Sequence, residues 1–128
     1  MRTALAAVFL CACSSPSPPA ETFNGCTAFV DGATVSFGGQ DGSPLFGYSP
    51  PCLHVAPGAT VTFSGDFSVH PLASGTSPTD RAAGSPNNPI PETVSGSSLT
   101  VTFPAAGTYP YFCEMHYAAG MAGVVRVE

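Results

Sequence analysis

The chain has 128 residues, which is enough for one domain and too short for two. It carries a formal net charge of -5 and contains no lysine, so it lacks the clustered basic side chains that bind nucleic-acid phosphates. Hydrophobic residues make up 44%, and the 14 glycines and 14 prolines favour short elements joined by turns over long helices. The composition predicts one small acidic domain with a real core and no nucleic-acid partner.

The N-terminus has the pattern of an export signal. Arg2 precedes a short apolar run over residues 4–12, which is too short to span a bilayer as a mature helix. The run ends in Leu10-Cys11-Ala12-Cys13, which resembles a bacterial lipobox and makes Cys13 the predicted lipidated first residue of the mature protein. An ordinary signal peptide cut after one of residues 12–15 is the alternative. Both interpretations place the protein outside the cytoplasm.

Three segments follow from this interpretation. Residues 1–12 form the predicted signal peptide, and residues 13–21 form a tether that is rich in proline and serine and has no apolar periodicity. Residues 22–128 form the expected folded domain. We therefore expect a protein of the periplasm or cell envelope, which touches a bacterial membrane only through its N-terminal lipid anchor.

Alternation of apolar and polar residues predicts an all-β domain. The alternation is strict, with β-branched and aromatic side chains, over residues 33–37, 59–63 and 99–103. We expect further strands at 52–55, 109–113 and 123–127. Residues 73–92 are rich in glycine, proline, serine and asparagine and predict a long irregular crossing. Several short strands separated by turns are typical of a sandwich or barrel with Greek-key connections.

Candidate metal ligands gather near the end of the chain. Cys113, His116 and Met121 place a thiol, an imidazole and a thioether close together after a predicted strand. One cysteine, two histidines and a weak axial methionine are the ligands of blue-copper sites, whereas methionine is a poor zinc ligand. His70 follows a strand and its turn and is the predicted second imidazole. His54 lies within an alternating strand, so we expect it to be an ordinary surface histidine.

With these four residues in place, the sequence resembles the cupredoxins, and the plastocyanin/azurin type in particular. The resemblance covers about Phe23–Glu128 and implies a Greek-key β-sandwich of about eight strands that holds one type 1 copper ion. It also implies that His70, Cys113 and His116 are equatorial ligands and Met121 is the axial ligand. It rests on the spacing Cys113-x-x-His116-x-x-x-x-Met121, on Gly65-Asp66-Phe67-x-x-His70-Pro71-Leu72, and on the strand Tyr109-x-Tyr111 that leads into the cysteine.

Two positions depart from the family pattern. Met115 stands where plastocyanins often carry proline, and we expect it to be a surface residue rather than a ligand. Pro71 follows the first histidine and has no N–H to donate to the cysteine sulfur. Tyr109 and Tyr111 are expected to pack beside the metal site.

The resemblance implies a carrier of single electrons rather than an enzyme, because four protein ligands leave no open position for a substrate. Electrons would pass through the exposed edge of His116 during weak, transient docking of a larger redox protein. The uncharged neighbours of His116 would form the docking surface, and we expect a monomer. The alternative is a module that stores or delivers copper without carrying electrons.

Two cysteines remain, Cys26 and Cys52. Once the chain is exported, two leftover cysteines pair naturally, so we expect a structural disulfide, with two free thiols as the alternative. The acidic residues show no paired spacing, and we interpret them as solvated charges. These acidic residues are Asp31, Asp41, Asp66, Asp80, Glu92 and Glu114.

Overall fold

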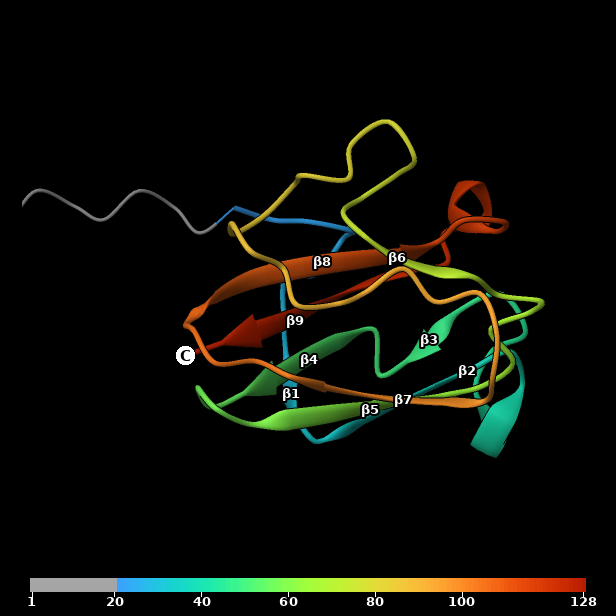
Figure 1. Ribbon diagram of the computed structural model, residues 1–128, viewed down its shortest axis with the longest axis horizontal. Helices are drawn as coiled ribbons and strands as arrows, with labels where there is room; N and C mark the ends of the chain where they lie inside the picture. Colours follow the sequence, from blue (N-terminus) through green and yellow to red (C-terminus); the bar gives the residue numbers. More distant parts are fainter. Residues whose placement is uncertain (1–20) are drawn as a thin grey trace, which may run out of the picture.

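The alternating segments build the two β-sheets that face each other in the computed structural model, which describes residues 21–128 (Figure 1). One sheet has the order β1-β4-β9-β8-β6 and the other the order β3-β2-β5-β7. The predicted all-β sandwich is confirmed. The predicted signal peptide, Cys13 and the tether up to residue 20 lie outside the described residues.

The first sheet is mixed, because β1 and β4 pair in parallel, as do β4 and β9, while β8 runs antiparallel to both β9 and β6. Its strands are β1 (Val30–Asp31), β4 (Cys52–Val55), β6 (Leu72–Ser74), β8 (Gly107–Cys113) and β9 (Ala122–Val127). The strands of the second sheet are β2 (Thr34–Phe37), β3 (Tyr48–Ser49), β5 (Thr60–Ser64) and β7 (Ser98–Thr102).

The core lies between the sheets and follows directly from period-two patterning. In β5, Val61 and Phe63 are fully buried, while Thr60 and Thr62 lie on the opposite face of the strand. Val61 is opposite Val101 of β7, so the antiparallel register places apolar side chains of neighbouring strands on the same buried face. Tyr111 of β8 packs edge-on against Phe63 from the other sheet, at 5.1 Å between ring centroids.

All six predicted strands are present, with ends that differ by two residues at most. Three strands were not predicted, namely β1, β3 and β6, because two or three residues are too few to show alternation. The expected irregular crossing over 73–92 is largely right. Beyond the end of β6 it contains only a short bridge between Ser77 and Asp80.

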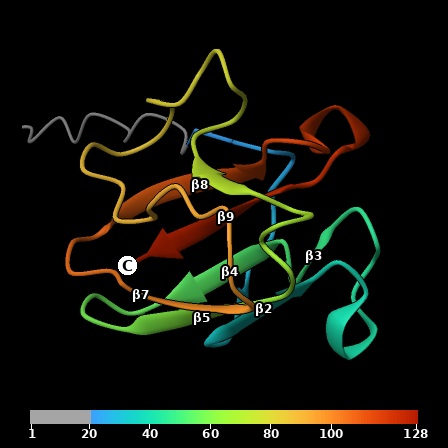
Figure 2. The same ribbon diagram turned by 45° about the vertical axis from the view of Figure 1, so that its right-hand side comes forward.

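Two short 3₁₀ helices lie at one end of the sandwich. They are η1 (Gln40–Gly42) and η2 (Tyr117–Ala119). Figures 1 and 2 show both on the right, at the end opposite the C-terminus, where β8 also ends. Within residues 21–128, no helix has the length and apolar character needed to cross a membrane.

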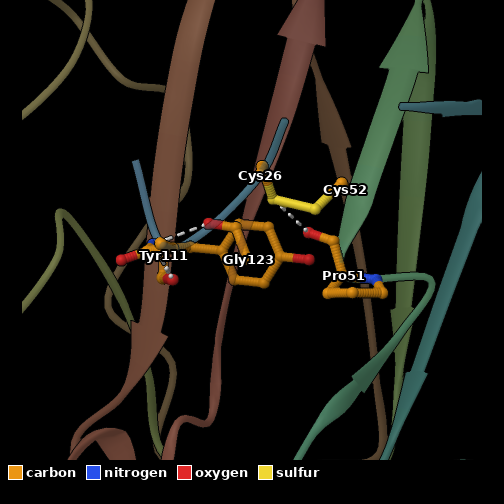
Figure 3. Close-up of a disulfide and its surroundings, with 6 residues drawn as sticks. Cys26, Pro51, Cys52, Tyr111 and Gly123 are labelled. Atoms are coloured by element: carbon orange, nitrogen blue, oxygen red, sulfur yellow. Dashed lines mark hydrogen bonds between the residues drawn. A yellow bond between two sulfur atoms is a disulfide. The ribbon is translucent and has the colours of Figure 1, made fainter. Parts of the chain in front are cut away.

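A disulfide joins Cys26, before β1, to Cys52, the first residue of β4. The sulfur atoms are 2.02 Å apart and the Cα atoms 5.6 Å apart. Figure 3 shows this cross-link beside Pro51, close to the β8 and β9 residues Tyr111 and Gly123. The sequence interpretation left a disulfide and two free thiols open, and the structure contains the disulfide.

Candidate metal centre

Three donor atoms converge at the η1/η2 end of the sandwich. The Nδ1 atoms of His70 and His116 are 3.1 Å apart, and the Sγ atom of Cys113 lies 3.6 Å from Nδ1 of His116 and 4.0 Å from Nδ1 of His70. Among residues 21–128, these form the one group of three histidine, cysteine or carboxylate donors that lie within 4.8 Å of one another. His70 and Cys113 are buried.

Strand β6 explains why His70 reaches Cys113. Leu72 of β6 is directly opposite Cys113 of β8, so the residues just before Leu72 are carried to the end of β8. A turn then fixes the backbone of His70, whose N–H donates to the carbonyl oxygen of Asp66 at 3.0 Å. The Asp66 carboxylate caps this turn by accepting from the main-chain N–H and the hydroxyl of Ser68, at 2.9 and 2.6 Å.

Gly38 forms the back wall of the His70 imidazole. Its φ of +65° is a left-handed conformation, and a Cβ at this position would come within 2.8 Å of Cδ2 and 2.9 Å of Nε2 of His70. The ring of Phe37 stands edge-on at 6.0 Å. The imidazole therefore lies against backbone on one side, and its Nδ1 atom points toward Cys113.

The loop between β8 and β9 returns Met121 to the cysteine. The N–H of Cys113 donates to the carbonyl of Met121 at 2.9 Å, and the N–H of Met121 donates to the carbonyl of His116 at 3.2 Å. The tight loop is closed by η2 and by Gly120, whose φ is +89°. Met121 is fully buried. Together with the three converging donors, it completes the arrangement of a type 1 copper site.

The electrostatics of the site favour neutral donors in the metal-free protein. Burial raises the pKa of the Cys113 thiol, although the main-chain N–H groups of Met115 and His116 act in the opposite direction. Burial also lowers the pKa of His70, and the nearby imidazole of His116 lowers it further. A metal ion that binds the thiolate therefore has to displace a proton from Cys113.

The donor set fits copper. A thiolate and a thioether are soft ligands, imidazole suits copper well, and one cysteine, two histidines and one methionine form the blue-copper set. When bound, copper supplies a one-electron couple, which none of the four side chains has on its own. The protein contributes position and a largely dry shell around the donors.

Comparison with known proteins decides the family. A family model described as copper binding proteins of the plastocyanin/azurin family matches residues 33–128. The chain belongs to this family. The expected membership in the cupredoxins, and copper as the cofactor, are therefore confirmed.

Two relatives illustrate how this cupredoxin compares with other members. It is 34% identical over 110 residues to the chloroplastic plastocyanin of Physcomitrium patens, a match that covers 79% of this chain and 61% of that protein. It is 33% identical over 99 residues to plastocyanin A/B of Petroselinum crispum, which covers 75% of this chain and all of that protein. Among solved structures it resembles pseudoazurin from Methylobacterium extorquens AM1, with a TM-score of 0.57 and 20% identity over 77% of this chain and 75% of that one. This likeness supports the cupredoxin fold alone.

One residue of the cupredoxin lies elsewhere than the sequence suggested. Tyr109 packs on Phe103 and donates its hydroxyl hydrogen to the carbonyl of Ala105 at 2.8 Å, so it is not beside the metal site. The reason is geometric, because Tyr109 is four positions before Cys113 on an extended strand, a distance of about 13 Å. Tyr111 lies in the core, against Phe63.

Five of the six acidic residues are exposed, as expected of solvated charges, and Glu114 is intermediate; two of the six also form ion pairs. Asp31 lies 2.5 Å from Nδ1 of His54, because parallel pairing of β1 and β4 places these two residues opposite each other. Glu114 pairs with the guanidinium of Arg81. His54 itself lies outside the donor group and is about one-third exposed, as expected of a surface histidine.

Proposed function

We propose that this cupredoxin is a type 1 copper protein that carries single electrons between larger redox proteins. The observation that supports this most strongly is the convergence of two imidazole nitrogens on one buried thiol, with a buried methionine hydrogen-bonded to the same cysteine through the backbone. We assign His70, Cys113 and His116 as the equatorial ligands and Met121 as the axial ligand. Four protein ligands leave no open position for a substrate, so a carrier fits this site better than an enzyme.

His116 is the route that the burial pattern favours for electrons. It is partly exposed, whereas His70 is 5% exposed and Cys113 and Met121 are fully buried. Exposed hydrophobic side chains flank the two ligand histidines in sequence or belong to the loop whose Phe46 packs on His116, and we call them the apolar patch. Such a patch supports brief docking without a strong charge requirement. The apolar patch consists of Leu45, Phe46, Val69, Met115 and Tyr117.

An optical and electron-paramagnetic-resonance spectrum of the copper-loaded chain tests the ligand assignment. We expect an intense thiolate-to-copper band, and Cys113→Ser should abolish it. Met115→Leu is the matched control, because Met115 is a sulfur-containing neighbour that is 68% exposed and lies outside the proposed ligand set. Survival of the band in Cys113→Ser, or its loss in Met115→Leu, would contradict the assignment.

A carrier releases an electron and keeps its copper ion, whereas a copper-delivery module releases the copper ion itself. A carrier should cycle reversibly between Cu(II) and Cu(I) and keep the metal when it meets an apo-acceptor or a chelator. A delivery module should give up copper under the same conditions. Repeated reduction and reoxidation in the presence of a Cu(I) chelator, followed by the optical band, separates the two functions.

We further propose that residues 1–12 direct export and that Cys13 carries a lipid, which would tether residues 22–128 to the membrane through the proline-rich segment. The lipobox-like sequence supports this proposal. Mass spectrometry of membrane-extracted protein should find an acylated Cys13. Cys13→Ala should move the protein to the soluble fraction, while Cys11→Ala should leave it in the membrane. An unmodified Cys13 would contradict lipid attachment and favour the alternative, an ordinary signal peptide.

A further inference from the structure

A segment outside the family match is attached to β8 and β9, the two strands joined by the loop that holds His116 and Met121. The match begins at residue 33, and residues 23–31, which we call the N-terminal strap, precede it. The strap runs past β8, β9 and β4 of the first sheet. It ends as β1, which pairs in parallel with β4 through Val30 opposite Leu53. Side chains of the strap therefore contact β8 and β9, although the strap itself precedes the residues that the family model matches.

Asn24 is the residue of the strap that hydrogen-bonds to both β8, which ends at Cys113, and β9, which begins just after Met121. Its side-chain Nδ2 group donates to the carbonyl of Tyr111 at 3.1 Å and to the carbonyl of Gly123 at 2.9 Å. Tyr111 and Gly123 are directly opposite each other in the β8–β9 pair. Figure 3 shows both residues beside the disulfide. One amide group thus spans two neighbouring strands with its two N–H donors.

These two carbonyls lie close to the metal ligands along the chain. Tyr111 is two residues before Cys113, and Gly123 is two residues after Met121. The next bond toward the site is the one from the Cys113 N–H to the Met121 carbonyl. Any change in the separation or register of the strands at Tyr111 and Gly123 is therefore transmitted to the relative position of the two sulfur-bearing side chains.

The disulfide holds this contact in place. Cys26 is 2% exposed and is two residues from Asn24, and its N–H closes a turn on the carbonyl of Phe23 at 2.9 Å. Asn24 occupies the left-handed region, with a φ of +49°, so the turn is a specific conformation rather than an extended chain. Cys52, the partner cysteine, is opposite Val124 in the β4–β9 pair. The cross-link therefore anchors the turn to the strand beside the ligand hairpin.

A second contact fixes the far end of the strap. The guanidinium of Arg126, on β9, lies 3.9 Å from the ring centroid of Phe29. Asn24 and Phe29 are thus both seated on the β8–β9 hairpin, with the disulfide between them in sequence.

We propose that Asn24 is a positioning residue of the copper centre, which clips β8 to β9 beneath Cys113 and Met121, and that the Cys26–Cys52 disulfide keeps this clip closed. The part of this inference that concerns copper rests on the proposed function. The part that concerns the hairpin can be tested in the metal-free protein and does not depend on the proposed function.

Asn24→Asp tests the clip with little change in shape. Aspartate has the same size and also tolerates a left-handed backbone, but its carboxylate has no N–H to donate to two carbonyl oxygens. Asn87→Asp is the matched control, because Asn87 is an exposed asparagine with a φ of +59° in the segment between β6 and β7, and aspartate tolerates this conformation equally well. Cys26→Ser/Cys52→Ser removes the cross-link while keeping Asn24.

Amide hydrogen exchange of the metal-free full chain gives the first readout. In Asn24→Asp, the amides of Tyr111, Cys113 and Gly123 should exchange at least about tenfold faster, while those of β5 and β7 in the other sheet keep their rates. Asn87→Asp should change none of them. Unchanged protection in the hairpin would overturn the proposal, and so would an equal acceleration in both sheets, because that is the result of a general loss of stability.

The copper-loaded chain gives the second readout. Asn24→Asp should shift the relative intensities of the copper bands or the copper hyperfine splitting, and Asn87→Asp should leave both unchanged. Cys26→Ser/Cys52→Ser should accelerate exchange in the hairpin beyond the acceleration that its general loss of stability causes in β5 and β7. Adding Asn24→Asp to it should increase this hairpin excess little further, because both act on one contact. Fully additive effects would overturn the role of the disulfide. If the wild-type chain shows no blue-copper spectrum, the proposed function fails while the exchange experiment still decides the clip.

Discussion

The ring of Phe46 lies against the imidazole of His116, with 4.7 Å between the ring centroids and an angle of 43° between the planes. The same ring is 6.4 Å from the imidazole of His70. Phe46 is 54% exposed and comes from the loop between η1 and β3, far from both histidines in sequence. It therefore shields the one partly exposed ligand from solvent while remaining on the surface itself.

Phe46→Ala should loosen the copper centre. Aromatic pairs contribute about 0.5–1.5 kcal/mol beyond the area they bury, so removing the ring should speed copper loss to a chelator by up to about tenfold. The reason is that His116 loses the surface that holds its ring and excludes water. Stopped-flow decay of the optical band in excess chelator measures this rate.

Leu45→Ala is the control for that change. Leu45 is the neighbouring residue in the apolar patch and is 65% exposed, but it has no ring to stack on His116. Its removal should leave the rate of copper loss unchanged. Equal rates in the Phe46 and Leu45 variants would show that the stacked ring does not hold the ligand.

Gly38→Ala should disturb His70, whereas the same substitution at Gly58 should not. Both Gly38 and Gly58 have a positive φ, +65° and +86°, so alanine at each costs about 1–2 kcal/mol of backbone strain. A Cβ at Gly58 meets nothing within 4 Å, whereas one at Gly38 would come within 2.8 Å of the His70 ring. Thermal unfolding of the two metal-free variants should therefore show similar losses of stability from backbone strain. Gly38→Ala should lose at least as much stability as Gly58→Ala.

Copper binding distinguishes these two variants. Only Gly38→Ala should weaken copper affinity and alter the optical spectrum, because only there does the new methyl group displace an imidazole from its position beside Cys113. Competition titration with a chelator of known affinity measures the difference. Equal copper affinity in Gly38→Ala and Gly58→Ala would mean that the back wall of His70 does not position it.

The sandwich was predictable because its longest strands alternate strictly. In β5, for example, Val61 and Phe63 face the core, and three threonine or serine residues face away, which is readable without a structure. The spacing from Cys113 to Met121 was readable for a similar reason. All three ligands of that segment lie in one short loop, so their proximity is local.

The remaining features depend on contacts that no local pattern records. Strand β6 has three residues, yet its pairing of Leu72 with Cys113 is what delivers His70. The stacking of Phe46 on His116 joins residues 70 positions apart. The clip formed by Asn24 spans 87 and 99 positions to its two carbonyls. Such long-range contacts are determined by tertiary packing, which single-sequence periodicity does not report.

Copper affinity should rise with pH because the metal competes with a proton on Cys113. Burial raises the pKa of this thiol above its ordinary value, so the metal-free site keeps the proton throughout neutral pH. Below that pKa, each unit of pH increase should raise the affinity about tenfold. The lowered pKa of His70 means that a second competing proton from this residue appears only at pH values below the ordinary histidine range.

Anaerobic calorimetry with Cu(I) measures this proton directly. Titrations at pH 7.5 in two buffers with different ionisation enthalpies should report release of about one proton per copper ion. Cys113→Ser should lose this release along with most of the affinity. Copper binding without proton release in the wild-type chain would mean that the thiol is already ionised in the metal-free protein, contrary to the direction of its pKa shift.

Removing the Cys26–Cys52 cross-link should destabilise the metal-free protein substantially. The bridge joins residues 26 positions apart, and restricting a loop of this size in the unfolded chain stabilises the fold by about 3 kcal/mol. Cys26→Ser/Cys52→Ser should therefore lower the melting temperature by about 10–20 °C for a domain of this size.

Cys113→Ser is the control, because it removes a buried thiol without touching the cross-link, and it should cost much less stability in the absence of copper. Calorimetric melting of the three metal-free proteins measures both effects. A loss below about 1 kcal/mol in the double variant would show that the strap is held mainly by its other contacts, Asn24 on the hairpin and Phe29 on Arg126.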